Sequence, residues 1–244
     1  MKLNETEHIE YIGNELKLIV SKEHTFGTDA LLLASFASPS KNSLACDFGT
    51  GCGIIPFYWI RQQLCKIIYS FEIQKNGYDQ LLRSVELNSI DKLIPFNCDL
   101  RDIPREIPKG QFDLITMNPP YTKENAGIIS TGDSAKIARH GITCTFDDVC
   151  YAASKMLKFG GRLCMCLRPE RLIELIKAMQ SVKIEPKRIR FVSQRDGLTP
   201  WLVLVEGKLG RKSGLIVEPE LHIENNNGEI SSEMLEIIGS YRKE

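Results

Sequence analysis

A glycine-rich turn between an apolar strand and an apolar helix is the feature that most constrains the fold of this chain. The turn reads Asp47-Phe48-Gly49-Thr50-Gly51-Cys52-Gly53. It follows the apolar residues 44–46 and precedes the apolar residues 54–60. Its three glycines let the backbone adopt positive φ and approach a bound ligand closely. A strand, a glycine-rich turn and a helix in this order are typical of an α/β unit that binds a ligand at the turn.

The spacing of these glycines excludes three common ligand loops. The pattern G-x-G-x-G differs from the dinucleotide pattern G-x-G-x-x-G. No Gly-Lys-Ser or Gly-Lys-Thr follows the turn, as a phosphate loop requires. Asp-Phe-Gly also occurs in protein kinases, but this chain has no His-Arg-Asp loop and no matching strand lysine. The turn therefore predicts another kind of ligand.

Two further acids close the next apolar segments. Residues 67–71 lead to Glu72, and residues 94–98 lead to Asp99. An acid that closes the second strand of such a unit can accept both hydroxyls of a ribose, and one that closes the third can accept from an adenine amino group. Taken singly, each is better explained as an ordinary solvated acid. Together with Asp47 and the glycines, they predict a nucleoside cofactor along the carboxyl edge of a sheet.

A stiff tetrapeptide, Asn118-Pro119-Pro120-Tyr121, follows the apolar residues 112–117. The two prolines lack N–H donors, and each biases the preceding residue toward extended geometry. The Asn118 side chain and the carbonyls of Asn118 and Pro119 can therefore accept hydrogen bonds from an exocyclic NH₂ group, while Tyr121 can stack on its ring. Alone, the tetrapeptide is equally well a bland turn. In a chain that also carries the glycine turn earlier in its sequence, the tetrapeptide predicts a site for a planar amine.

These motifs together resemble the class I S-adenosylmethionine-dependent methyltransferases that modify amino groups. The stretch from His24 to Ala34 resembles the N-terminal cofactor segment of the bacterial tRNA(Val) adenine-N6 methyltransferases, in which Thr-Asp or Leu-Asp opens a helix of Ala and Leu. Ala138-Arg139-His140 also resembles that group. The resemblance extends over nearly the whole chain, from the N-terminal hairpin to an expected late strand at residues 214–217. Methyltransferases of glutamine amides and of guanine N2 share Asn-Pro-Pro-Tyr or close variants.

The resemblance implies methyl transfer from S-adenosylmethionine to N6 of an adenine in tRNA, at adenine-37 beside the anticodon of a tRNA(Val). It implies that Asn118 and the Pro119 carbonyl accept the two N6 hydrogens and that Tyr121 stacks on the flipped base. The implied cofactor residues are Asp29, Asp47, Gly49, Gly51, Gly53, Glu72 and Asp99. Among them, Asp29 is equally well only a helix cap. The alternative substrates are a protein glutamine amide and an rRNA or DNA amino group. A glutamine methyltransferase would normally bring a helical N-terminal domain, where this chain has a predicted hairpin.

The net charge of zero conceals an uneven distribution. Residues 1–121 carry 12 Lys and Arg against 15 Asp and Glu, residues 122–212 carry 17 against 9, and residues 213–244 carry 2 against 7. Basic charge in the segment that directly follows the Asn-Pro-Pro-Tyr loop favours a phosphate-bearing substrate. The residues predicted to contact RNA are Arg139, His140, Lys187, Arg188 and Arg190. The alternative is that these charges are solvated faces of helices and strands.

Alternating strands and helices predict an α/β fold with a Rossmann-like, doubly wound and mostly parallel seven-stranded sheet. The strands are expected near residues 44–48, 67–72, 94–98, 112–117, 162–167, 187–193 and 201–207, the last antiparallel. The helices are expected near residues 53–64, 76–90, 145–157 and 170–181. Thr145-Phe146-Asp147-Asp148 resembles a capping box at the start of the third of these helices, and Gly160-Gly161 follows its expected end. Thr28 or Asp29 is expected to cap an earlier helix, and Gly13-Asn14 predicts a hairpin over residues 9–20. The expected organisation is effectively one domain, with an N-terminal part (1–40), a core (41–210) and a C-terminal extension (211–244).

The remaining expectations concern partners and location. The eight cysteines include no Cys-x-x-Cys pair, which favours small core residues over a metal site or disulfides. No apolar run approaches the length of a membrane span, and the polar start is no signal peptide. We therefore expect a reduced, cytoplasmic monomer or weak dimer with no obligatory protein partner. The long irregular stretch 122–144 is expected to order over a substrate.

Overall fold

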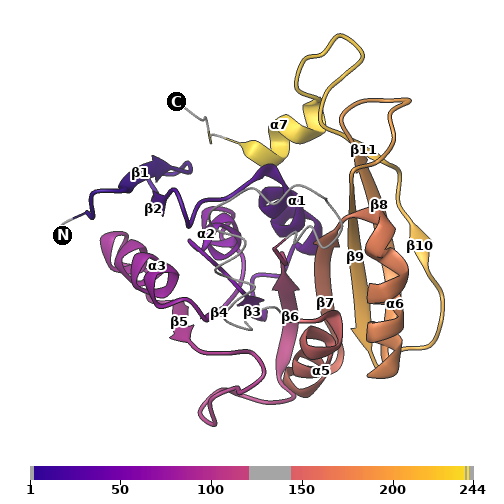
Figure 1. Cartoon of the computed structure of the whole chain (residues 1–244), viewed down its shortest axis with the longest axis horizontal. Helices are drawn as coiled ribbons and strands as arrows, with labels where there is room; N and C mark the ends of the chain where they lie inside the picture. The colour runs from indigo at the N-terminus through magenta and orange to yellow at the C-terminus, as the bar shows by residue number, and fades with distance from the viewer. Residues whose placement is uncertain (1–2, 121–143, 240, 242–244) are drawn as a thin grey trace, which may run out of the picture.

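The computed structural model describes residues 3–120, 144–239 and 241. A central sheet has helices on both faces, and a two-stranded hairpin packs beside it (Figure 1). The strands are β1 (Glu7–Tyr11), β2 (Lys17–Ser21), β3 (Leu44–Phe48), β4 (Ile67–Glu72), β5 (Leu93–Asn97), β6 (Phe112–Met117), β7 (Leu157–Leu167), β8 (Ile184–Ser193), β9 (Leu202–Leu209), β10 (Ile216–Val217) and β11 (Leu221–His222). The helices are α1 (Thr28–Ala37), α2 (Ile54–Arg61), α3 (Lys75–Leu87), α5 (Phe146–Met156), η1 (Pro169–Arg171), α6 (Leu172–Ser181) and α7 (Ser232–Ile238).

The sheet has the doubly wound order β8-β9-β7-β6-β3-β4-β5, and the two-residue strands β10 and β11 add to β8. β3 pairs in parallel with β4 and β6, and the parallel pairing continues to β5 and β7. β9 is antiparallel to both of its neighbours. The predicted class of sheet is therefore confirmed, including the antiparallel last long strand. The short strand β10 lies within residues 214–217, where a late strand was expected, whereas the short strand β11 was not predicted.

Side chains that alternate along the strands supply two separate cores. Leu114 of β6 and Cys164 of β7 face the cluster formed with α1 and α2, whereas their neighbours in the sequence, Ile115 and Leu163, face the cluster formed with α5 and α6. This period of two is the ordinary geometry of a strand buried on both faces. The helices consequently cover both faces of the sheet, and its carboxyl edge is left to form a site.

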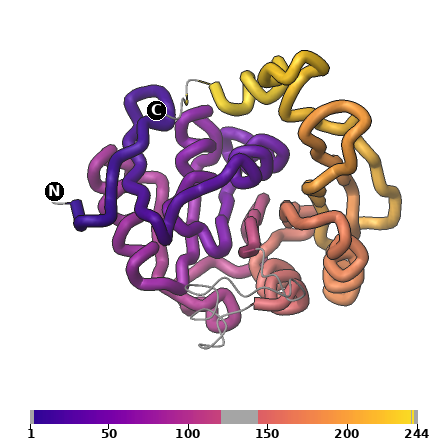
Figure 2. Tube along the Cα trace, turned by 45° about the horizontal axis from the view of Figure 1, so that its top comes forward, coloured from indigo at the N-terminus to yellow at the C-terminus, as the bar shows by residue number. Residues whose placement is uncertain are grey.

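The N-terminal hairpin and α7 are held by side chains of the core. The Gln80 amide of α3 donates to the carbonyls of Ile19 and His24, at 2.8 and 2.9 Å. The Arg61 guanidinium at the end of α2 donates to the carbonyls of Ile12, Ile237 and Ile238. Figures 1 and 2 both show α7, in yellow, returning from the later strands toward the N-terminal segment. These bonds hold the N-terminal segment and α7 against the helices α2 and α3.

Three local predictions have different outcomes. The capping box of α5 is confirmed, because Thr145 Oγ1 accepts from the Asp148 N–H while Asp148 accepts from the Thr145 N–H. The predicted cap of α1 is wrong: Gly27 occupies the N-cap position, with no side-chain cap. Gly160-Gly161 lies inside β7 instead of in a loop after α5. A Cβ at Gly161 would come within 2.7 Å of the Phe112 carbonyl, so this glycine permits the close approach of β7 to β6.

Candidate active site at the carboxyl edge of the sheet

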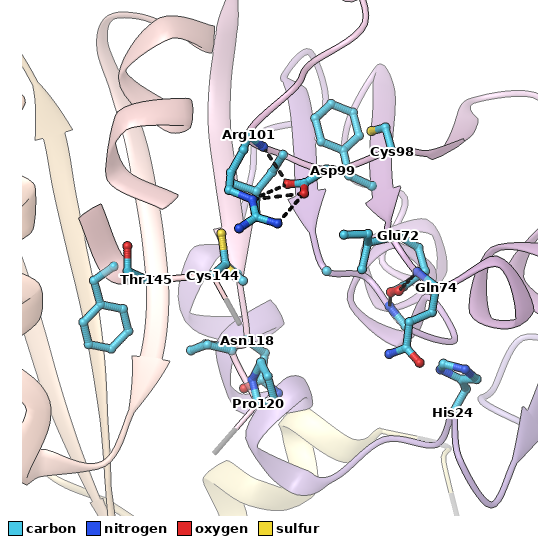
Figure 3. A pocket seen from close by; sticks show the side chains of 18 of the residues that line it. His24, Glu72, Gln74, Cys98, Asp99, Arg101, Asn118, Pro120, Cys144 and Thr145 are labelled. Atoms are coloured by element: carbon cyan, nitrogen blue, oxygen red, sulfur yellow. Dashed lines mark hydrogen bonds and ion pairs between the residues drawn. The ribbon is translucent and has the colours of Figure 1, made fainter. Parts of the chain in front are cut away.

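A cavity of about 400 Å³ opens at the carboxyl edge of the sheet, where the ends of β3, β4, β5 and β6 meet (Figure 3). A second cavity of about 240 Å³ lies against the same edge, toward the N-terminus of α1. Gly49, Gly51, Asn118, Pro119 and Pro120 line both cavities. The glycine turn and the start of the Asn-Pro-Pro-Tyr loop, predicted separately from the sequence, therefore border one continuous site.

The three glycines of the turn serve different purposes. All have positive φ, at 61° for Gly49, 55° for Gly51 and 91° for Gly53. A Cβ at Gly51 would meet no atom within 4 Å, so the backbone there faces open space beside the cavity. A Cβ at Gly53 would instead collide with Leu81 of α3. Gly51 thus leaves room for a ligand, whereas Gly53 lets α2 begin close to α3.

Glu72, at the end of β4, has a fixed carboxylate. Its Oε2 accepts from the Gly51 N–H at 2.9 Å, and its Oε1 accepts from the Gln74 N–H at 2.8 Å. The residue is buried, yet it lines the cavity. Because an ionised carboxylate offers about four acceptor positions, these two bonds orient Glu72 and leave capacity for ligand hydroxyls.

Asp47, at the end of β3, lies buried beneath the glycine turn. Thr116 Oγ1 donates to its Oδ1 at 2.6 Å. Its Oδ2 and the Thr50 hydroxyl are both buried. Neither atom forms a hydrogen bond of good geometry with a residue that the structure describes. Burial raises the pKa of Asp47 to about 7, although the nearby hydroxyls of Thr116 and Thr50 act in the opposite direction. A buried acceptor without a donor, beside the smaller cavity, fits a ligand that brings a cationic or N–H group.

Asp99 is paired with a residue that sequence reasoning missed. Arg101 donates from Nε and Nη2 to both carboxylate oxygens of Asp99, at 2.6 to 3.0 Å (Figure 3). These hydrogen bonds hold the pKa of Asp99 below its usual value. Both residues line the larger cavity. This wall of the larger cavity consequently carries an ionised carboxylate that is paired with a guanidinium.

Asn118, directly after β6, contacts two residues that are remote in the sequence. Its Nδ2 donates to Asp29 Oδ2 at 3.1 Å, and its Oδ1 lies 3.1 Å from the Cys166 thiol, which acts as donor. Cys166 belongs to β7 and is fully buried. From the sequence, Cys166 was predicted only to be a small core residue. No feature of the sequence indicated that Cys166 or Asp29 touches the amide of Asn118.

The predicted RNA-contact residues lie elsewhere. Lys187, Arg188 and Arg190 belong to β8 and do not border either cavity. Arg188 pairs with Glu206 and Glu218, and Arg190 pairs with Glu233. Tyr121, Arg139, His140 and the stretch 122–143 lie outside the described residues. RNA contact by these five basic residues and base stacking by Tyr121 stay predictions.

The described part of the chain offers neither a cluster of metal ligands nor a membrane-spanning helix. Residues 3–120, 144–239 and 241 contain no group of three or more His, Cys, Asp and Glu placed to hold a metal ion. All eight cysteines are free thiols. No helix within these ranges is long and apolar enough to cross a bilayer.

Comparisons with known proteins agree with this geometry. A family model described as the methyltransferase small domain matches residues 19–183. A tRNA1(Val) (adenine(37)-N6)-methyltransferase of Flavobacterium psychrophilum is 24% identical over 203 residues, covering 81% of this chain and 86% of the relative. The enzyme of the same name from Histophilus somni is 27% identical over 210 residues, covering 85% of each.

Solved structures show the same fold at low identity. A predicted O-methyltransferase from Agrobacterium tumefaciens is 19% identical, covers 88% of this chain and 98% of its own, and has a TM-score of 0.67. TrmN from Thermus thermophilus is 18% identical, covers 74% of this chain and 48% of its own, and has a TM-score of 0.55. These likenesses establish the architecture of the chain.

Proposed function

Because the chain belongs to the methyltransferase small domain family, we propose that it transfers a methyl group from S-adenosylmethionine to the exocyclic N6 of an adenine in tRNA. The observation that carries the proposal is that Asn118-Pro119-Pro120 borders the same cavity as Gly49 and Gly51. An amine acceptor and a cofactor turn therefore share one space. The names of the curated relatives support tRNA as the substrate and adenine-37 of a tRNA(Val) as the target. A tRNA substrate in turn supports a cytoplasmic location.

The residues at the carboxyl edge fit this cofactor. Glu72, fixed by two backbone N–H groups, is suited to hold the ribose hydroxyls. Asp47 Oδ2 offers a buried acceptor beside the glycine turn, where a cationic amino group would meet an ionisable carboxyl. Asp99 is suited to accept from the adenine amine, and the open space at Gly51 lets the backbone approach the ligand. When bound, S-adenosylmethionine supplies a methyl group already activated on a sulfonium.

The chain has to orient the substrate nitrogen, because an activated methyl group requires no nucleophile on the protein. Asn118 Oδ1 and the Pro119 carbonyl would accept the two N6 hydrogens and direct the nitrogen lone pair away from the ring. Pro120 keeps this loop rigid, and Tyr121 is proposed to stack on the base. The proton leaves after methyl transfer, so no His or Cys general base is assigned.

The test is methylation of unmodified total tRNA by the purified chain with labelled S-adenosylmethionine, followed by digestion and nucleoside mass spectrometry. Ribosomal RNA, DNA and release-factor protein serve as competing substrates. We expect N6-methyladenosine in tRNA alone, and its loss in Asn118→Ala. Asn226→Ala, the same change in an exposed turn, serves as the matched control.

Calorimetric titration with S-adenosylhomocysteine completes this test. Asn118→Ala should retain cofactor binding while losing turnover; loss of both would make Asn118 a structural residue. Label in protein, rRNA or DNA with none in tRNA would replace the proposed substrate by one of the alternatives.

A further inference from the structure

We infer that Asp29 is a positioning residue that fixes the orientation of the Asn118 amide, so that Oδ1 and not Nδ2 is presented to the substrate amine. The inference rests on the proposed function, because it concerns the oxygen that accepts from that amine. Asp29 is the second residue of α1, and Asn118 directly follows β6. The two residues are 89 positions apart in the sequence, and both line the smaller cavity.

The chemistry of the Asp29–Asn118 contact decides which way the amide faces. The two side chains meet at 3.1 Å through Asp29 Oδ2. An ionised carboxylate only accepts hydrogen bonds, whereas an amide has a donor end and an acceptor end. The end of Asn118 that faces Asp29 must therefore be Nδ2. The reverse orientation would place two acceptors against each other and leave both unsatisfied.

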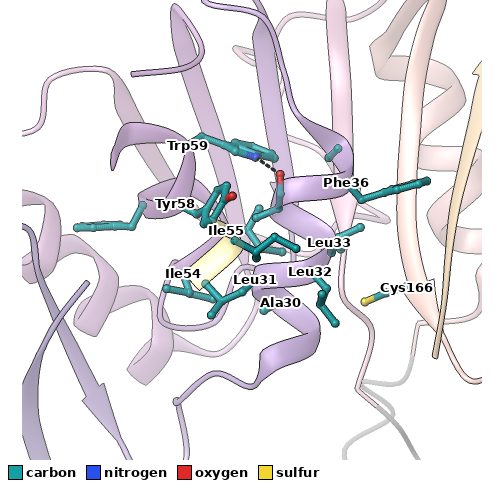
Figure 4. Packing of buried hydrophobic residues seen from close by; sticks show 14 of the residues in the cluster. Ala30, Leu31, Leu32, Leu33, Phe36, Ile54, Ile55, Tyr58, Trp59 and Cys166 are labelled. Atoms are coloured by element: carbon teal, nitrogen blue, oxygen red, sulfur yellow. Dashed lines mark hydrogen bonds between the residues drawn. The ribbon is translucent and has the colours of Figure 1, made fainter. Parts of the chain in front are cut away.

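A second contact holds the opposite end of the same amide. The Cys166 thiol donates to Asn118 Oδ1 at 3.1 Å from β7, whose Met165 pairs with Met117 of β6. A thiol is a weak donor, and a carbonyl oxygen has two lone pairs. The contact consequently favours the same orientation of the amide as the contact from Asp29 does. Figure 4 shows Cys166 across from α1, and it belongs to the same buried cluster as Ala30.

The position of the Asp29 carboxylate is itself fixed. Its Oδ1 accepts from the Ala30 N–H at 2.9 Å. A Cβ at Gly27 would lie 2.6 Å from this oxygen. Gly27 has φ −111° and ψ 175°, an extended conformation open to any residue. Glycine at this position is therefore explained by the room that the Asp29 carboxylate needs, and not by backbone conformation.

A flipped Asn118 amide would oppose the reaction. Its Nδ2 would then point to where the substrate N6–H groups arrive, and two donors would face each other. Asp29 excludes this state through Asn118, without touching the reacting atoms. The role differs from the cofactor contact predicted for Asp29 from the sequence, and the two roles make different predictions.

The first test is Asp29→Asn, because the amide has one oxygen where the carboxylate has two. If that oxygen stays on the Ala30 N–H, an NH₂ group faces Asn118 and favours its flipped state. We expect the single-turnover methylation rate at saturating cofactor to fall roughly 10- to 100-fold. The dissociation constant for S-adenosylhomocysteine should change by less than about twofold, since no cofactor contact is lost. Asp79→Asn, the same change at a half-exposed position of α3 that borders neither cavity, is the matched control.

The second test keeps the Asp29 side chain but displaces its carboxylate. Gly27→Ala is allowed by the backbone but places a methyl group against Asp29 Oδ1. We expect a slower single-turnover rate with unchanged affinity for S-adenosylhomocysteine, as in Asp29→Asn. Cys166→Ser keeps a donor to Asn118 Oδ1 and should be less damaging than Cys166→Ala.

Two results would overturn the inference. A normal single-turnover rate in Asp29→Asn would show that the Asn118 orientation does not depend on Asp29. A normal rate at saturating cofactor combined with weaker S-adenosylhomocysteine binding would make Asp29 a cofactor ligand. Failure of the proposed function is distinguishable, because it appears in the wild-type chain as absence of N6-methyladenosine before any variant is compared. If the wild type methylates another amino group, the same variants are measured on that substrate.

Discussion

Asp47→Asn is expected to stabilise the chain more at alkaline than at acidic pH. Burial raises the pKa of Asp47 from 3.8 to about 7. A carboxyl whose pKa is higher in the folded than in the unfolded chain stabilises the fold below its unfolded pKa. That stabilisation is lost as the pH rises through its folded pKa, because the unfolded chain then binds fewer protons than the folded one. The sensitive window therefore runs from about pH 4 to about pH 7.

The magnitude follows from the same two values. One pKa unit corresponds to about 1.4 kcal/mol, so the rise from 3.8 to about 7 corresponds to about 4 kcal/mol between the fully protonated and fully ionised limits. Between pH 5 and pH 8, linkage leaves about 2 to 3 kcal/mol of this change. Asparagine has nearly the same shape, does not ionise, and keeps an oxygen that can accept from Thr116 Oγ1. The variant should consequently lack this part of the pH dependence.

The assay is urea unfolding of both proteins without ligand at pH 5, 6, 7 and 8, with linear extrapolation to water. The free energy of unfolding of Asp47→Asn minus that of the wild type should rise by about 2 to 3 kcal/mol across this range. Groups that titrate equally in both proteins cancel in the difference. Asp196→Asn, in an exposed loop, should give a flat difference. A flat difference for Asp47→Asn as well would refute the reasoning that burial sets the protonation of Asp47.

Three further substitutions separate the roles of other residues. Glu72→Gln turns one of two oxygens that accept from backbone N–H groups into a donor. Calorimetry should show that the affinity for S-adenosylhomocysteine falls roughly tenfold or more. An unchanged affinity would argue against a ribose contact. Gly53→Ala, at φ 91° and against a side chain of α3, should lower the free energy of unfolding in urea by about 1 to 3 kcal/mol, and equal stability would contradict the strain. Glu206→Ala removes the buried partner of Arg162 and Arg188, and it should lower the free energy of unfolding by about 2 to 3 kcal/mol. A loss below about 0.5 kcal/mol would mean that solvent already screens these two arginines.

The fold was predictable because its signals are local. Apolar runs bounded by Gly, Pro and Asn predicted the parallel strands, and the glycine turn predicted where the first long crossover begins. The hairpin about Gly13-Asn14 and the antiparallel β9 were predicted correctly, and the family match confirms the predicted class of methyltransferase. The starts of β7 and β8 were placed several residues too late. For β7 the reason is that Gly160-Gly161 reads as the end of a helix, although it lies inside the strand where β6 approaches closely.

The site was predictable only where a residue closes a strand. Because the carboxyl ends of parallel strands converge, Asp47, Glu72 and Asn118 were expected together, and they border adjoining cavities. Contacts between individual side chains have no such rule. The pairing of Asp99 with Arg101 depends on how the chain turns after β5, whereas the sequence was interpreted only in terms of a solvated acid or an acceptor for an adenine amine.

The contact between Asp29 and Asn118 shows why the remaining information is spatial. Asp29 was interpreted as a helix cap or a cofactor ligand, because an acid at the start of a helix suits either role. Gly27 takes the cap position instead, and the carboxylate turns to the Ala30 N–H and to Asn118. Since a carboxylate can only accept, this single contact gives a direction to an amide that otherwise has two. The Asn-Pro-Pro-Tyr motif supplies an amide at the right strand end. Asp29 of α1 then determines that the amide oxygen, which the reaction requires as an acceptor, faces the substrate.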